Sequence, residues 1–179
     1  MTSTNYPNQK IRLWEPLIVL FLAVGAIIYA VNAFNSQDFL WFLSKSVDAT
    51  PDRIVVWVDG EQTVIQPGHD DYLTLSTAVN ESVSDFSNTN LINIGFGDDT
   101  LTYYDTDGVL VELYYSNPVN FHAPFRTGEP TQLLVPVNGR HSGKDYFFRG
   151  DEGKWWFGAM RMADSEPLFT ALAELGYTQ

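Results

Sequence analysis

The sequence predicts an α+β domain with a mostly antiparallel sheet and about two helices, preceded by one N-terminal transmembrane helix. Residues 16–34 read PLIVLFLAVGAIIYAVNAF, a run without charge in which Asn32 is the single polar side chain. Beyond residue 52, short β-rich runs are separated by Asp-Gly and Pro-Gly pairs, and apolar residues take helical spacing in two places. Strands grouped together with few helices favour the α+β class.

The apolar run is long enough to cross a bilayer. Its 19 residues would rise about 28 Å as a helix, close to the roughly 30 Å of hydrocarbon in a membrane. A cleaved signal peptide is the main alternative, since Lys10 and Arg12 precede the run and Ala33 offers a small residue near a cleavage site. The run exceeds the usual h-region of about 7 to 15 residues, and a buried core helix would show a polar stripe. We therefore favour a retained anchor.

Flanking charge predicts the orientation of this span. Lys10 and Arg12 lie before it, whereas Lys45 is the one basic residue among the fifteen that follow it. Basic residues stay on the cytoplasmic side. We expect a single-pass protein of the cell membrane with a cytoplasmic N-terminus and an extracytoplasmic C-terminal domain.

The chain divides into four predicted parts: a cytoplasmic tail at 1–15, the transmembrane helix at 16–34, a juxtamembrane segment at 35–52 and the α+β domain at 53–179. The juxtamembrane segment contains FLWFL at 39–43. A helix in the membrane interface and a helix docked on the domain both fit this pattern, and the aromatic residues favour the interface.

The domain begins with a predicted hairpin and a helix. Residues 53–58 and 61–66 are β-rich and flank Asp59-Gly60, a pair suited to a type I′ turn. Asp70 or Asp71 then caps a predicted helix that runs to about Phe86.

Strand-like patterns return in the middle of the chain, at 91–96, 101–106 and 109–116, and predict an antiparallel meander. Residues 117–130 contain three prolines and form the longest irregular stretch, which is long enough to be a functional loop.

Three further elements complete the domain. The run at 131–139 is a predicted strand in which Pro136 requires an edge or a bulge. Residues 146–150 and 154–162 are predicted to form the last hairpin. A final helix is expected from Ser165 to Leu175, with Gly176 as its stop.

Net charge excludes one class of partner. Residues 35–179 carry 8 Lys and Arg against 21 Asp and Glu, a net charge of −13. This field repels phosphate backbones, so we expect no nucleic acid as a partner. The chain has no cysteine, which removes disulfides and thiolate chemistry.

No catalytic, cofactor or metal pattern stands out. His69-Asp70-Asp71 could hold a base or a metal, but its place at a helix start favours capping. The Asp105–Gly108 run lacks the outer ligands of a calcium loop and suits a turn, with Asp98-Asp99 facing it across a hairpin. The predicted sets of catalytic, cofactor-binding and metal-binding residues are therefore empty.

One cluster points to a partner surface. Basic residues and paired tryptophans gather in a short part of an otherwise acidic domain. On a strand, Trp155 and Phe157 would share one face and Trp156 the other, which could expose an aromatic platform. The candidate residues are Arg140, His141, Lys144, Arg149, Lys154, Trp155 and Trp156.

The sequence thus favours a single-pass membrane protein with a non-catalytic extracytoplasmic domain for partner or ligand binding, such as an accessory subunit of a membrane complex. The alternative is a membrane-tethered hydrolase acting on an envelope polymer, with an acid pair such as Asp151-Glu152 in a cleft.

Overall fold

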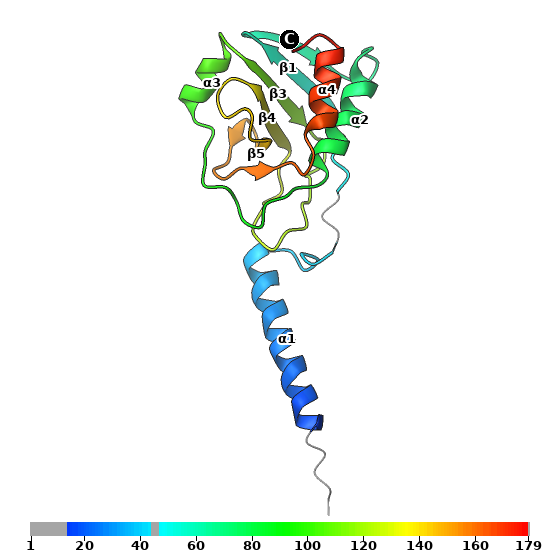
Figure 1. Ribbon diagram of the computed structural model, residues 1–179, viewed down its shortest axis with the longest axis vertical. Coiled ribbons are helices and arrows are strands. Elements are labelled where there is room, and N and C mark those ends of the chain that lie inside the picture. Colours follow the sequence, from blue (N-terminus) through cyan, green and yellow to red (C-terminus); the bar gives the residue numbers. More distant parts are fainter. Residues whose placement is uncertain (1–13, 44–46, 179) are drawn as a thin grey trace, which may run out of the picture.

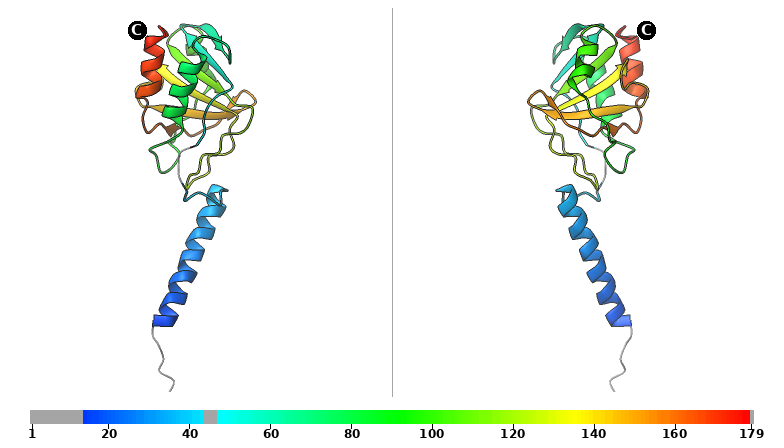
Figure 2. Two further views of the ribbon diagram at one scale, coloured as in Figure 1. Left: turned by 90° about the vertical axis from the view of Figure 1, so that its right-hand side faces the viewer. Right: turned by 90° about the vertical axis from the view of Figure 1, so that its left-hand side faces the viewer.

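The computed structural model describes residues 14–43 and 47–178, which form one long helix and an α+β domain (Figure 1). Most of the predicted cytoplasmic tail and a few residues of the juxtamembrane segment lie outside these ranges. Figure 2 shows from two sides that the long helix points away from the domain.

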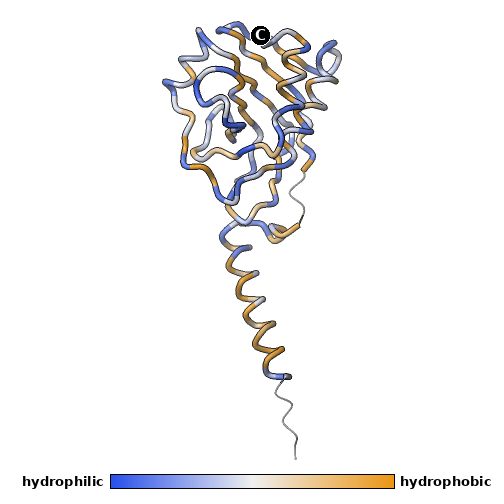
Figure 3. The backbone as a smooth tube through the Cα atoms, viewed as in Figure 1, coloured by the Kyte–Doolittle hydropathy of each residue, from blue (hydrophilic) through white to orange (hydrophobic). Residues whose placement is uncertain are grey.

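The helix α1 (Trp14–Ser36) is long and apolar enough to cross a membrane. Only 6% of its most apolar stretch is buried against the rest of the chain. Its apolar side chains are exposed all round, and Figure 3 shows that the helix is almost uniformly hydrophobic, whereas hydrophobic and hydrophilic residues alternate along the domain. A membrane anchor and a signal sequence share these properties.

The domain is built on an antiparallel sheet of order β2-β1-β3-β4-β5-β6, in which β7 also pairs with β5. Every pairing between named strands is antiparallel, as the sequence predicts. The strands are β1 (Arg53–Val58), β2 (Glu61–Ile65), β3 (Val109–Tyr114), β4 (Gln132–Asn138), β5 (Tyr146–Asp151), β6 (Lys154–Trp155) and β7 (Met160–Arg161).

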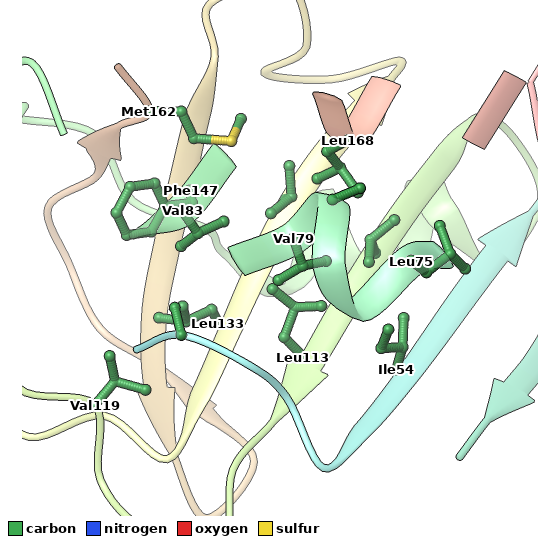
Figure 4. Packing of buried hydrophobic residues seen from close by; sticks show 14 of the residues in the cluster. Ile54, Leu75, Val79, Val83, Leu113, Val119, Leu133, Phe147, Met162 and Leu168 are labelled. Carbon is green, nitrogen blue, oxygen red and sulfur yellow. The ribbon is translucent and has the colours of Figure 1, made fainter. Parts of the chain in front are cut away.

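One face of the sheet is covered by α2 (Tyr72–Val83) and α4 (Glu166–Glu174). Leu75, Val79 and Val83 recur at helical spacing on α2 and are buried on this face. They pack against strand residues such as Leu113 and Leu133, as Figure 4 shows. This cluster is the main core of the domain.

The opposite face is covered by α3 (Asp98–Tyr104) and by residues 91–97. The predicted strand at 101–106 is therefore wrong. Asp98 and Asp99 lie in the first turn of a helix, where carboxylates complement the dipole, and Thr100 and Tyr104 are buried at i, i+4 spacing. For the same reason the two aspartates do not face Asp107 across a hairpin.

Residues 91–96 do not form the predicted strand either. Ile92 makes one isolated bridge with Ala159, through Ile92 N–H to Ala159 O at 2.9 Å and the reverse bond at 3.0 Å. Gly95 and Gly97 interrupt the segment, and glycine within a strand weakens it. The segment follows the last strands without joining the ladder.

Three predictions that depend on only a few neighbouring residues are confirmed. Asp59 and Gly60 have φ of 49° and 88°, as a type I′ turn requires. Pro136 pairs with Leu110 next to the register shift of the β3–β4 ladder, so the predicted bulge is present. The last helix also lies where the sequence places it, with Ser165 before it and Gly176 after it at φ 83°.

Two predicted elements differ in detail. The second strand of the last hairpin shortens to β6, because the chain bends after Trp155 before β7 pairs with the other end of β5. Asp71 occupies the cap position of α2, but its side chain makes no capping bond and accepts instead a hydrogen bond from the Tyr177 hydroxyl at 2.7 Å. Burial, and then this hydrogen bond to the Asp71 carboxylate, raise the pKa of Tyr177 to about 12.

Candidate functional site

The end of the domain nearest α1 brings together the longest loop of the described residues and several cavities that polar side chains help to line. We call it the α1-proximal end, defined by residues 36–38, the loop 115–130 and Trp156. The loop descends from β3 to the end of α1 and returns to β4 (Figure 1). His122 Nδ1 lies 2.8 Å from Asp38 Oδ2, which connects the loop to the segment that follows α1.

Alternate residues of this loop are buried although it pairs with no strand. Val119, Phe121, Ala123, Phe125 and Thr127 all point inward. The rings of Phe121 and Phe125 lie edge-on to Phe86 at 6.2 and 6.0 Å. Because the odd positions are held in the core, the polar side chains between them face the cavities at this end.

Arg149 is the largest fully buried side chain of the domain, with 2% of its surface exposed. Its guanidinium donates to the carbonyl oxygens of Thr127 and of Gly158, the latter at 3.0 Å. Within residues 14–43 and 47–178 no carboxylate lies within ion-pair distance of it, and its Nε has no hydrogen-bond partner. Burial lowers the Arg149 pKa to about 10. A buried guanidinium is stabilised by an anion, and here the domain supplies none.

Three consecutive aromatic rings each lie against a glycine of another segment. A Cβ atom on Gly150, Gly128 or Gly95 would come within 3.0 Å of the ring of Trp155, Trp156 or Phe157 respectively. Trp155 also packs on the second cluster, whereas Trp156 lies near Arg149, with 5.8 Å between the guanidinium carbon and the ring centroid. Trp156 and Phe157 line the same cavity, so the alternation expected of a strand does not extend beyond Trp155, where β6 ends.

Three cavities lie side by side at the α1-proximal end. The first, about 420 Å³, is lined by Asp48, Asp52 and His122 among others. The second, about 450 Å³, lies between Ser36–Asp38 and residues 126–129. The third, about 280 Å³, is lined by apolar, aromatic and basic residues. They are Leu91, Arg126, Thr127, Gly128, Arg149, Trp156 and Phe157.

Charge is unevenly divided among these cavities. Asp48 and Asp52 line the first cavity, and Asp38 and Glu129 line the second together with Arg126. The third cavity has two arginines and no acidic residue in its lining. In a domain of net charge −13, this is a local concentration of positive charge.

The candidate partner residues are separated along β5. Arg140, His141 and Lys144 lie in the β4–β5 turn, whereas Lys154, Trp155 and Trp156 lie beyond its other end, about 17 Å away over five strand steps. Arg140 and Lys144 are exposed, as is Lys154, while Arg149 is inside the domain. Whether any of these residues contacts a partner stays a prediction.

The β4–β5 turn is held by α3 and by aromatic side chains. Arg140 donates to the Asp99 carbonyl oxygen at 3.0 Å and lies over the Tyr103 ring at 5.1 Å. His141 lies between Phe96 and Phe148, with ring centroids at 5.9 and 5.8 Å. Burial, and then the Arg140 charge, lower the His141 pKa.

The other clusters singled out in the sequence have structural roles. His69 Nδ1 accepts the Asp71 amide at 3.2 Å at the start of α2. Asp59 Oδ1 accepts the Gly108 amide at 2.9 Å, which ties the Asp-Gly turn of the first hairpin to the chain entering β3. Across the described residues, no group of three or more His, Asp or Glu side chains is placed to hold a metal ion.

Sequence reasoning missed the residues that shape this end. Arg126 and Thr127 lie in the loop whose length predicted a function, but nothing local marks either as part of a cavity. Asp38 and His122 are 84 residues apart, so their contact has no local signal. Only the Phe121, Ala123, Phe125 alternation could have shown which loop positions face outward.

Comparisons with protein-family models, curated proteins and solved structures gave no match for this chain.

Proposed function

We propose that the chain is a single-pass membrane protein with its N-terminus in the cytoplasm and a non-catalytic extracytoplasmic domain that binds a ligand or partner at the membrane surface. Such a domain suits an accessory subunit of a membrane complex. The observation that carries the proposal is α1, an apolar helix of 23 residues that the domain leaves uncovered. In water these side chains would expose a large apolar surface, whereas in a bilayer hydrocarbon surrounds them.

Contacts at the end of α1 support an anchor over a cleaved signal peptide. The chain turns back after Ser36, so that the Tyr29 hydroxyl donates to the Phe39 carbonyl oxygen at 3.0 Å and the Phe42 ring lies edge-on to Tyr29 at 6.0 Å. Cleavage near Ala33 would remove Tyr29 and with it this turn.

The same turn forms an apolar collar around the end of α1, defined by Phe39, Leu40, Phe42 and Leu43. All four side chains are exposed, by 47 to 73%. Aromatic and aliphatic residues at such a position suit the interface between hydrocarbon and headgroups. The collar supports the predicted interfacial role of this segment, although its residues form turns and not a helix.

The test follows the full chain in membranes. An anchored protein resists carbonate extraction, and protease added outside the cell digests the domain. Ala26→Arg should reduce the membrane-retained fraction, because a charge at the helix centre costs roughly 2.5 to 3.5 kcal/mol on insertion scales. Gln66→Arg adds the same charge at an exposed position of the domain, away from the helix, and should insert normally.

A soluble product that begins near Phe34 would show instead that α1 is a signal peptide. Protection of the domain from external protease would overturn the proposed orientation.

A further inference from the structure

We propose that the cavity between Arg126 and Arg149 binds the phosphate group of a zwitterionic phospholipid headgroup. This inference rests on the proposed anchoring of α1, because anchoring brings the cavity to the level of the headgroups.

The first argument is the unpaired charge of Arg149. Two carbonyl oxygens accept from its guanidinium, but a carbonyl carries no net charge, and no described carboxylate lies near enough to pair with it. Arg126 is exposed and lines the same cavity. Two guanidinium groups around one cavity match a phosphate, which accepts several charge-assisted hydrogen bonds.

The second argument is position. The cavity between Arg126 and Arg149 shares Arg126, Gly128 and Trp156 with the second cavity. That second cavity is also lined by Ser36–Asp38, the segment at which α1 ends. The collar of exposed apolar residues lies directly beyond that segment. The polar layer of a bilayer is several Å thick, and Trp is enriched there. Trp156 and Arg126 therefore lie where headgroups begin.

The third argument is the distribution of charge around the cavity. A domain of net charge −13 repels an anionic membrane surface, which disfavours an anionic lipid as the ligand. Glu129 is exposed and lines the adjoining cavity, in which Arg126 also takes part. A headgroup with a phosphate and an ammonium group could thus place each charge beside an opposite one.

The experiment uses the full chain, purified in a non-ionic detergent and freed of lipid. The probes are dihexanoylphosphatidylethanolamine, its anionic counterpart dihexanoylphosphatidylglycerol, inorganic phosphate, and dihexanoylglycerol, which has the same acyl chains without phosphate. Tryptophan fluorescence reports binding, since Trp156 lines the cavity.

Arg126→Gln is the test variant, because Arg126 is exposed and its loss should leave the fold intact. Its affinity for the phospholipid should fall about tenfold, the effect of losing one charged hydrogen bond. Lys144→Gln removes one exposed positive charge at the β4–β5 turn and should bind as the wild type does. Arg149→Lys keeps the charge but not the fork of donors, and a folded variant should bind more weakly as well.

Four results would overturn the proposal: equal losses in Arg126→Gln and Lys144→Gln, no difference between the phospholipid and dihexanoylglycerol, inorganic phosphate binding as tightly as the phospholipid, or a preference for dihexanoylphosphatidylglycerol. Carbonate extraction of the same variants separates this inference from the proposed function. Chains that stay in the membrane without binding the phospholipid contradict the lipid site alone, whereas chains that leave the membrane contradict the anchor.

Discussion

The two ends of the sheet are closed in different ways. At the end far from α1, short turns connect the strands, and backbone groups meet directly: Asp59 N–H donates to Gly108 O at 2.9 Å. At the α1-proximal end, the loop 115–130 closes the domain through buried side chains and the guanidinium of Arg149. The far end is closed by backbone geometry, whereas the proximal end is closed by side chains that leave polar cavities between them. Such cavities are where a ligand finds both space and charge.

The largest effect of a single substitution is expected at the far end, for Gly60→Ala. Gly60 has φ 88°, and a Cβ there would meet the Asp105 carbonyl group under 3.0 Å. Backbone cannot rotate away as a side chain can, so strain and overlap together should destabilise the domain by about 3 kcal/mol or more. Urea unfolding of the full chain in detergent would measure it.

Gly68→Ala is the matched control, since Gly68 has φ 102° with nothing within 4 Å of the added Cβ. It should destabilise by about 1–2 kcal/mol. Equal losses of stability in Gly60→Ala and Gly68→Ala would mean that the close backbone contact of Gly60 with Asp105 does not contribute to the effect.

A smaller effect is expected at the α1-proximal end, for Gly128→Ala. Gly128 has φ 72°, and its added Cβ would meet the ring of Trp156, which is half-buried and able to move. Beyond the strain of a positive φ, we expect the free energy of unfolding to fall by a further ~1 kcal/mol. The tryptophan emission should also shift to longer wavelength.

Gly143→Ala controls for the backbone, since Gly143 has φ 67° and nothing within 4 Å. It should leave the emission spectrum unchanged. A spectrum that also stays unchanged in Gly128→Ala would place Trp156 elsewhere than against this loop.

The smallest predicted effect is a pH dependence at the β4–β5 turn. The folded state lowers the His141 pKa below 6.5, chiefly by burial, so the unfolded chain binds the proton more readily. The contribution of the neutral His141 ring to the free energy of unfolding is therefore complete above pH 6.5 and is lost as the pH falls below that value. His141→Phe should be less sensitive to acid between about pH 6.5 and 5 than the wild type.

Thermal unfolding at several pH values would measure this difference. If His141→Phe lost stability in acid as much as the wild type does, the acid sensitivity would not come from this ring.

The sequence predicts the far end well because its signals are local. The Asp59-Gly60 turn needs only two residues, and α2 follows from apolar spacing within twelve. The strand predicted at 101–106 is wrong because a short run with two tyrosines fits a strand as well as a helix, and the contacts that decide between them are on the sheet beneath α3.

The α1-proximal end depends on contacts between distant residues. Arg149 follows Tyr-Phe-Phe in a strand pattern, and its charge predicted a position on the surface of the domain. In the structure the side chain is inside, because the carbonyl oxygens of Thr127 and Gly158 accept hydrogen bonds from it. Length alone predicted that residues 117–130 are functional, and no local pattern could show that His122 would reach Asp38.

The central claim is that the α1-proximal end of the domain lies at the membrane surface. The chain has no cysteine, so a single Cys can be labelled without background. Glu129→Cys places a fluorophore at the proximal end, and Lys144→Cys places one in the β4–β5 turn; both positions are exposed. In proteoliposomes, a quencher attached to lipid headgroups should quench the label at 129 strongly and the label at 144 weakly. Equal quenching of the two labels, or stronger quenching at 144, would contradict the account.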